Sequence, residues 1–263
     1  MLSDTLSLAI LGILGLAIGF VGGLVGLVLG VIRFPLILGT EVSASITAGT
    51  NIGISTLGAL TAAIRHYRQH NIHLRIFVIM ASTGAVGGFL GARVTKFVPV
   101  DLLFLIIGII VSYEAYVLIS GSRKRNEYKI QNTKRNSTFI ESCIGFGIGF
   151  LGGVVGLVLG SIRMPAMISV LKMEPKVAVG TNLAAATIMG ISALIGHLIN
   201  NEVDYLTLGV MGSTAMIGGY IGAKYTGIFR PERLKLIIGF VLIIVAIFMF
   251  ANILLSYRSG SSF

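Results

Sequence analysis

Two arginines stand inside apolar, glycine-rich stretches, where a charged side chain is unusual. "GFVGGLVGLVLGVIRFP" fills residues 19–35 and "GFLGGVVGLVLGSIRMP" fills residues 149–165, with thirteen of seventeen positions identical. Each stretch carries an arginine two residues before its final proline, Arg33 and Arg163. A guanidinium offers a fixed fork of N–H donors that suits oxyanions. Because charge inside a membrane segment is costly and usually functional, we interpret both as anion-binding residues, although an arginine at a segment edge can also extend to the interface.

Glycines crowd the residues before each arginine. Glycine in a helix costs about 1 kcal/mol relative to alanine, so such a cluster marks either a helix break or close helix packing. If it marks a break, Pro35 and Pro165 start short outgoing half-helices, the first over residues 34–40, whose positive amino-terminal ends favour anions. The clusters are Gly22, Gly23, Gly26 and Gly30, and Gly152, Gly153, Gly156 and Gly160, the last two of each being assigned to the anion site.

Polar pairs follow each arginine in the next apolar segment. Thr50 and Asn51 stand in "AGTN", and Thr181 and Asn182 stand in "VGTN". Counting along a helix at about 1.5 Å per residue places Thr50 about 12 Å deep, near the middle of the membrane. Hydroxyl and amide groups there can bind a dehydrated oxyanion, or they can join helices to each other.

Three titratable residues are candidates for proton coupling. His66 and His197 occupy matching positions near the ends of their segments, where interfacial placement is the simpler interpretation. Glu114 stands well inside an apolar segment and has no acidic counterpart in the other half. A buried carboxylate is a proton-relay candidate in membranes, and pairing with a loop arginine is the alternative.

The elements that must position these residues are membrane helices. Of 263 residues, 55% are hydrophobic and 11% are charged, against about 25% charged in an ordinary soluble domain. A spanning helix needs about 20 apolar residues. Eight runs approach this length: residues 6–32, 42–64, 76–92, 102–120, 142–162, 177–201, 205–223 and 236–257. The sequence therefore predicts an all-α polytopic membrane protein.

The chain is predicted to be a duplication of one four-segment unit. Residues 1–121 form the first transmembrane repeat and residues 139–263 the second, joined by a basic linker at 122–138 that we expect to be cytoplasmic. "GGFLGAR" (87–93) in the first repeat matches "GGYIGAK" (218–224) in the second, which extends the similarity well beyond the glycine-rich stretches. Internal repeats of this kind are common in secondary transporters.

Charge counting favours an inverted arrangement of the two repeats. If all eight segments cross the membrane, each side receives 10 Lys and Arg residues. If the first segment of each repeat enters and returns on one side, the counts become 16 and 4. Because cytoplasmic loops carry excess positive charge, the second topology is favoured, with both termini outside and a re-entrant or broken first segment in each repeat. Eight plain crossings remain the alternative.

The ordered set of motifs resembles the sulfite exporter TauE/SafE family, also called the toluenesulfonate uptake permeases. The resemblance rests on the glycine-rich segments, on "AVGTNLAAATIMGISALIGHLINNEVDY" (178–205) and on "GGYIGAKYTGIFRPERLK" (218–235). It implies a membrane transporter for sulfite, sulfonates or related anions, with ion coupling. The family glycines fall on the two clusters above, its prolines on Pro35 and Pro165, and its Gly-Thr element on residues 180–181 and 49–50. The arginines depart from the family pattern, which indicates a different or more highly charged anion.

We therefore predict a secondary carrier in the plasma membrane that works by alternating access, with a proton as the candidate coupling ion. The alternatives are a passive anion channel and a structural membrane protein; no enzyme motif, cofactor site or metal site is predicted. The net charge of +10 is interpreted as loop charge that orients the protein in the lipid bilayer, so no nucleic-acid partner is expected. The sequence does not predict the oligomeric state.

Overall fold

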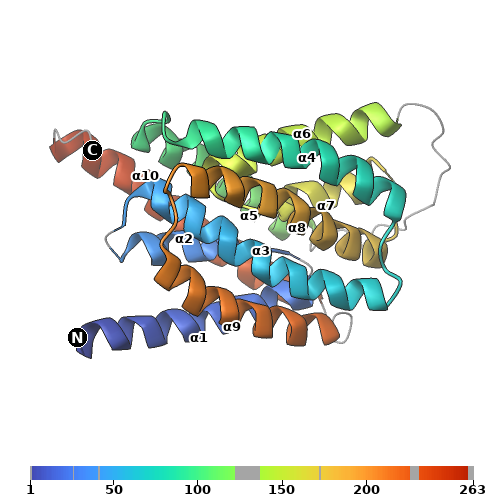
Figure 1. Ribbon diagram of the computed structural model, residues 1–263, viewed down its shortest axis with the longest axis horizontal. Coiled ribbons are helices and arrows are strands. Elements are labelled where there is room, and N and C mark those ends of the chain that lie inside the picture. Colours follow the sequence, from blue (N-terminus) through green and yellow to red (C-terminus); the bar gives the residue numbers. More distant parts are fainter. Residues whose placement is uncertain are drawn as a thin grey trace.

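The structure is a computed structural model that describes residues 2–25, 27–40, 42–121, 137–171, 173–225 and 231–259. These residues form helices joined by short connections, and none of them lies in a strand (Figure 1). The helices are α1 (Leu2–Val25), α2 (Gly30–Leu38), α3 (Ala44–Arg68), α4 (Leu74–Thr95), α5 (Val100–Gly121), α6 (Ser137–Val155), α7 (Gly160–Ser169), α8 (Pro175–Ile199), α9 (Tyr205–Lys224) and α10 (Pro231–Ser259). Most of the predicted linker lies outside the described residues.

Seven of the described helices are long and apolar enough to cross a membrane. The all-helical membrane class is thereby confirmed, but the expected eight apolar spans are reduced by one. The exception is α3, whose serines, threonines and asparagine make it too polar to qualify by composition. These polar side chains are buried inside the protein, so they do not meet lipid: Thr47, Thr50, Asn51, Ser55 and Thr56.

Helices from the two ends of the chain interlock. α1 packs along α9 and α6 packs along α4, while α3 contacts α8 and α5 contacts α10. Glycines allow the close approach, because a side chain on Gly23 would overlap the backbone of Gly219, and one on Gly153 would overlap that of Gly88. For these two glycines the helix-packing interpretation is the one that the structure supports.

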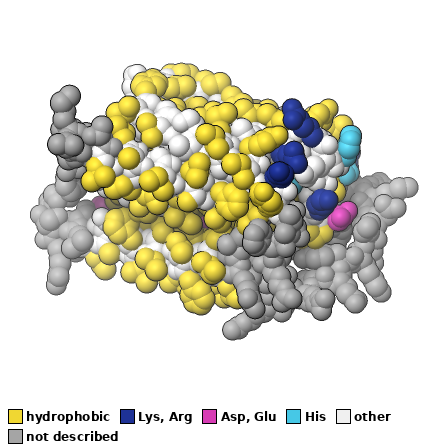
Figure 2. Space-filling model, turned by 90° about the horizontal axis from the view of Figure 1, so that it is seen from below, with side chains coloured by type: hydrophobic (Ala, Val, Ile, Leu, Met, Phe, Trp, Pro, Cys, Tyr) yellow, Lys and Arg dark blue, Asp and Glu magenta, His cyan; other side chains and the backbone are white. Residues whose placement is uncertain are grey.

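α3 and α8 run antiparallel at the centre of the bundle. Thr50, near the start of α3, bonds the backbone N–H of Asp204 after α8, and Thr181, near the start of α8, bonds that of His73 after α3. Figure 1 shows both chain ends at one end of the bundle and the α3–α4 connection at the other. Figure 2 shows a face dominated by hydrophobic side chains, on which Lys and Arg gather toward the end that carries the α3–α4 connection.

Each glycine-rich stretch contains a gap between two helices. α1 ends at Val25 before α2 begins at Gly30, and α6 ends at Val155 before α7 begins at Gly160. The second gap is capped by Leu157 N–H, which donates to the carbonyl of Gly152 at 3.0 Å, while the residue just before Leu157, Gly156, adopts φ +69°. This left-handed glycine after the helix is a common helix ending, because glycine has no Cβ to oppose it.

The expected start of the half-helices at the prolines is wrong. α2 begins at Gly30 and contains Pro35 as its sixth residue, ending at Leu38 rather than at residue 40. α7 likewise begins before Pro165, at Gly160. The helix resumes directly after the glycine gap, so the proline lies inside the helix and one internal hydrogen bond is missing, a change that costs about 3 kcal/mol or more in a helix interior. As a result each arginine is the fourth residue of its short helix instead of preceding it.

Candidate functional site

Arg33 is buried in the first turn of α2, with 2% of its surface exposed. Its Nε donates to Asn51 Oδ1 at 3.4 Å, and one terminal nitrogen donates to Ser55 Oγ at 2.6 Å. Both acceptors lie one helical turn apart on α3, so one face of that helix receives the guanidinium. Gly30 makes the approach possible, because a Cβ there would stand 2.7 Å from Ser55 Oγ.

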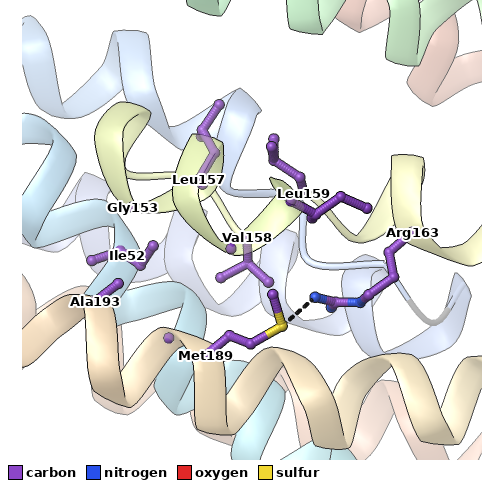
Figure 3. A pocket seen from close by; sticks show the side chains of 12 residues that line it. Ile52, Gly153, Leu157, Val158, Leu159, Arg163, Met189 and Ala193 are labelled. Carbon is purple, nitrogen blue, oxygen red and sulfur yellow. Dashed lines mark hydrogen bonds between the residues drawn. The ribbon is translucent and has the colours of Figure 1, made fainter. Parts of the chain in front are cut away.

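Arg163 occupies the matching place in α7 and is completely buried. Its Nε donates to Asn182 Oδ1 at 2.8 Å and one terminal nitrogen donates to the Asn182 carbonyl at 2.9 Å. The other terminal nitrogen faces the sulfur of Met189 at 2.9 Å, as Figure 3 shows. Gly160 again leaves room for the asparagine, since a Cβ there would stand 3.0 Å from Asn182 Nδ2.

The two guanidiniums share an unusual electrostatic situation. Among the described residues, no carboxylate oxygen lies within 4.0 Å of either one. The partners of Arg33 and Arg163 are neutral oxygens and one thioether. A buried charge without a counter-charge is costly, and anions are the partners that would lower this cost. Each site therefore has a positive charge available for an oxyanion.

Each arginine lies beside its own small cavity rather than in one shared pocket. The cavity beside Arg163 has a volume of about 10 Å³ and the one beside Arg33 about 20 Å³. The first also touches Ile52 of α3 and the second touches Leu183 of α8, because the α3–α8 pair lies at the centre of the bundle. A cavity of roughly 10–15 Å³ holds about one water molecule, so an oxyanion needs a change of conformation to enter.

Asn51 connects the two sites. While its Oδ1 accepts from Arg33, its Nδ2 donates to the carbonyl of Gly156 at 2.9 Å. A side chain on Gly156 would overlap the backbone of Ala48, so the second gap is held tightly against the start of α3. A movement of α3 that changes one arginine site must therefore also change the gap that precedes the other.

The structure does not bring the two predicted threonines to the arginines. Thr50 Oγ1 accepts the N–H of Asp204 at 2.8 Å, and Thr181 Oγ1 accepts the N–H of His73 at 2.9 Å. Asp204 and His73 cap the amino termini of α9 and α4. The connection between α8 and α9 therefore folds inward to meet Thr50. The Thr50 hydroxyl holds this connection in place.

Both histidines are completely buried inside the protein, and each lies in the last turn of its long helix. His197 Nδ1 lies 2.8 Å from Glu202 Oε2, and its Nε2 lies 2.9 Å from the carbonyl of Gly153. His66 Nδ1 lies 3.5 Å from Asn71 Nδ2, so an amide stands where the other half has a carboxylate. The inward-folded connections after α3 and α8 supply these partners, which is why the side chains do not reach the surface.

Glu114 lies on α5 with 4% of its surface exposed and accepts a hydrogen bond from Ser161 of α7. No arginine or lysine among the described residues lies within 4.0 Å of it, and the loops at 122–136 and 226–230 lie outside the described residues. Gly26 lies outside the described residues.

Sequence reasoning missed several partners that follow a simple helical spacing. Ser55 is four residues after Asn51, and Met189 is seven residues after Asn182, so both lie on the arginine-facing side of their helices. Ser161 is two residues before Arg163, on another side of α7. Counting onward from each asparagine by the helical repeat of about 3.6 residues would have identified Ser55 and Met189.

Comparison with known proteins identifies the family. A model described as sulfite exporter TauE/SafE matches residues 11–249. "Probable membrane transporter protein YdhB" of Bacillus subtilis (strain 168) is 28% identical over 88% of this chain and 93% of its own length. YunE of the same organism, with the same description, is 24% identical over 91% and 96%.

A protein described as "Probable membrane transporter protein" from Xylella fastidiosa (strain 9a5c) is 23% identical over 90% of this chain and 91% of its own length. No solved structure gives a significant match. The family match covers most of the chain and agrees with the seven apolar helices. The chain is a multi-pass membrane protein that belongs to the sulfite exporter TauE/SafE family of membrane transporters.

Proposed function

We propose that this protein carries a small sulfur-containing oxyanion, of the sulfite and sulfonate class, across the plasma membrane by alternating access. Arg33 and Arg163 bind the anion, and Asn51 and Asn182 orient the two guanidiniums. The single observation that carries this proposal is the pair of buried guanidiniums that have only neutral partners among the described residues. The family description supplies the substrate class.

Two inverted repeats, residues 1–121 and 139–263, form the moving halves in this proposal. Equivalent helices α3 and α8 run antiparallel, and their reciprocal threonine contacts agree with a two-fold axis in the membrane plane. α2 and α7 would turn back as half-helices after the glycine gaps, with positive ends near the middle of the bundle. The end of the molecule where Lys and Arg gather in Figure 2 would then be cytoplasmic.

The size of the two cavities favours a carrier over an open channel. Neither cavity admits more than about one water molecule, so this conformation is closed around both arginines. Rearrangement of α3 against the second gap would open one site while changing the other, because Asn51 bonds both Arg33 and the Gly156 carbonyl. Coupling of this kind is what alternating access requires.

A thermal-shift screen of the purified protein tests the proposal. Sulfite, sulfate, thiosulfate, taurine and simple alkanesulfonates are compared, since a ligand that binds the folded state raises its unfolding temperature by mass action. At least one anion should stabilise the native protein and the Arg68→Ala control, in which an exposed arginine at the end of α3 is removed. The double variant Arg33→Ala/Arg163→Ala should show no shift, and a shift of native size in that variant would contradict the proposal.

A further inference from the structure

A buried carboxyl group lies beside the second half-helix and has no equivalent beside the first. Glu114 accepts a hydrogen bond from Ser161, the second residue of α7. In the first half Val31 stands where Ser161 stands in the second. α10 packs against α2 as α5 packs against α7, yet residues 236–254 of α10 contain no ionisable side chain. The carboxyl is therefore a feature of one half only.

Nothing among the described residues compensates a negative charge on Glu114. Ser161 is its hydrogen-bond partner, and no cation lies within 4.0 Å. Arg163 follows Ser161 by two residues, which at about 100° per residue turns it to another side of α7, and there it bonds Asn182 and Met189 on α8. Glu114 is therefore buried, with 4% of its surface exposed. It lies close to the start of α7 and has no counter-ion among the described residues.

The other ionisable groups on helices that contact α5 lie at helix ends or face outward. Tyr113 and Tyr116 of α5 itself are 51% and 68% exposed, so they point away from the buried side. Apart from Arg163 on α7 and these two tyrosines, the other ionisable side chains on α5, α3 and α6 lie near helix ends. Asp101 is at the start of α5, and Glu141 and Cys143 are near the start of α6. The end of α3 carries Arg65, His66, Tyr67 and Arg68.

We propose that Glu114 is the proton-binding site that couples proton binding to anion binding at Arg163, an inference that rests on the proposed anion transport. The positive amino-terminal end of α7 attracts both a Glu114 carboxylate and an anion at Arg163. An ionised Glu114 therefore repels the anion and competes for the same positive field. Protonation removes that repulsion, so the proton and the anion bind together, each increasing the affinity for the other.

The His197–Glu202 pair is the rival proton site. It links the end of α8 to the carbonyl of Gly153, and Asn200 Nδ2 also donates to Glu202 Oε2 at 3.2 Å. His66 and Asn71 make the corresponding contact in the other half without a carboxylate. Because a neutral amide can replace Glu202 at the equivalent place, we assign this pair to the fixing of the inward-folded connection.

Calorimetric titration of thiosulfate at a series of pH values tests the proposal, because the charge of thiosulfate stays constant near neutral pH. As pH rises and Glu114 ionises, the Kd of the native protein should rise, by about 5- to 150-fold in total. Glu114→Gln should bind with the low-pH affinity at every pH. Glu141→Gln, which alters a buried carboxyl beside Arg75, should retain the native pH dependence. A native slope in Glu114→Gln, or a slope lost in Glu202→Gln alone, would overturn the assignment.

An infrared titration separates failure of this inference from failure of the proposed function. If the native protein binds thiosulfate at no pH, the anion site itself has failed that test. The carboxyl stretching band of a protonated buried acid can still be followed without any anion. Acidification of the native protein and of Glu141→Gln should produce a band that Glu114→Gln lacks, and identical spectra for native protein and Glu114→Gln would overturn the proton site.

Discussion

The Arg33 and Arg163 sites have the same charge and an equivalent asparagine side chain, but Arg163 also donates to the Asn182 carbonyl, and the last partner of each guanidinium differs. Arg33 donates to the hydroxyl of Ser55, whereas Arg163 faces the thioether of Met189. A hydroxyl is a good acceptor for a charged donor, and a thioether is a weak one. An anion that approaches Arg163 therefore displaces a weaker partner than one that approaches Arg33.

This difference indicates that the surroundings of the arginine are specialised in the second half of the molecule. The site with the weaker local partner also lies on the short helix that contacts Glu114, and its gap is the one fixed by Asn51. In the first half Arg33 donates to two neutral oxygens, those of Asn51 and Ser55. Duplication thus supplies two equivalent positive charges, and substitution at a few neighbouring positions gives them unequal roles.

Removal of each arginine should produce the largest effect and separate the two roles. Arg163→Ala should weaken anion binding by at least about 100-fold, as expected for the loss of two charge-assisted hydrogen bonds of about 1.5–3 kcal/mol each. Arg33→Ala should cost less, about 10-fold, because Ser55 already engages part of that guanidinium. Calorimetry on variants that remain monodisperse in detergent measures both values, and a larger loss for Arg33→Ala would reverse the comparison.

The second gap should be more sensitive to an added methyl group than the helix before it. Gly156→Ala places a side chain at φ +69° and against the backbone of Ala48, so it should destabilise the fold by at least about 1–2 kcal/mol. Gly147→Ala in α6 meets nothing within 4 Å and should stabilise the helix by about 0.5–1 kcal/mol. Thermal unfolding in detergent compares the two, and equal midpoints would show that the capped gap is not rigid.

The two residual partners of the arginines should differ in how much they contribute to stability. Ser55→Ala removes a hydrogen bond to a buried charge and should lower stability by about 1.5–3 kcal/mol. Met189→Leu preserves volume and removes only a weak acceptor, so it should cost less than about 1.5 kcal/mol. Thermal unfolding without anion is the measurement. If Met189→Leu proves the more damaging, the thioether is a stronger partner than the geometry indicates.

Much of the architecture follows from the sequence because membrane helices leave a strong local signal. Apolar runs predicted the positions of the long helices, and the ordered motifs predicted the family that the comparison confirms. Arg33 and Arg163 were conspicuous because a charge among apolar residues is rare. A helix break was one of two interpretations of the glycine cluster that contains Gly156, and the left-handed backbone of Gly156 supports it, because few other residues tolerate that conformation.

The remaining features depend on contacts between distant segments, which no local pattern encodes. The hydroxyl of Thr50 meets Asp204, 154 residues away, and the partner of Glu114 is Ser161, 47 residues away. Residues 42–64 were counted among the apolar runs because they carry no charge, yet α3 is too polar to qualify as a membrane span by composition. Pro35 was misplaced because proline is best accommodated at a helix start, a preference that the glycine gap overrides here.

Uptake of radiolabelled sulfite into liposomes that contain the purified protein tests most directly whether the two buried arginines carry the transported anion. The native protein and the exposed-arginine control Arg68→Ala should give saturable uptake, while Arg163→Ala should fall to the level of empty liposomes or close to it and Arg33→Ala should give clearly reduced uptake at a low sulfite concentration. Native, saturable uptake by both arginine variants would contradict the assignment, and uptake that never saturates would identify a channel instead of a carrier.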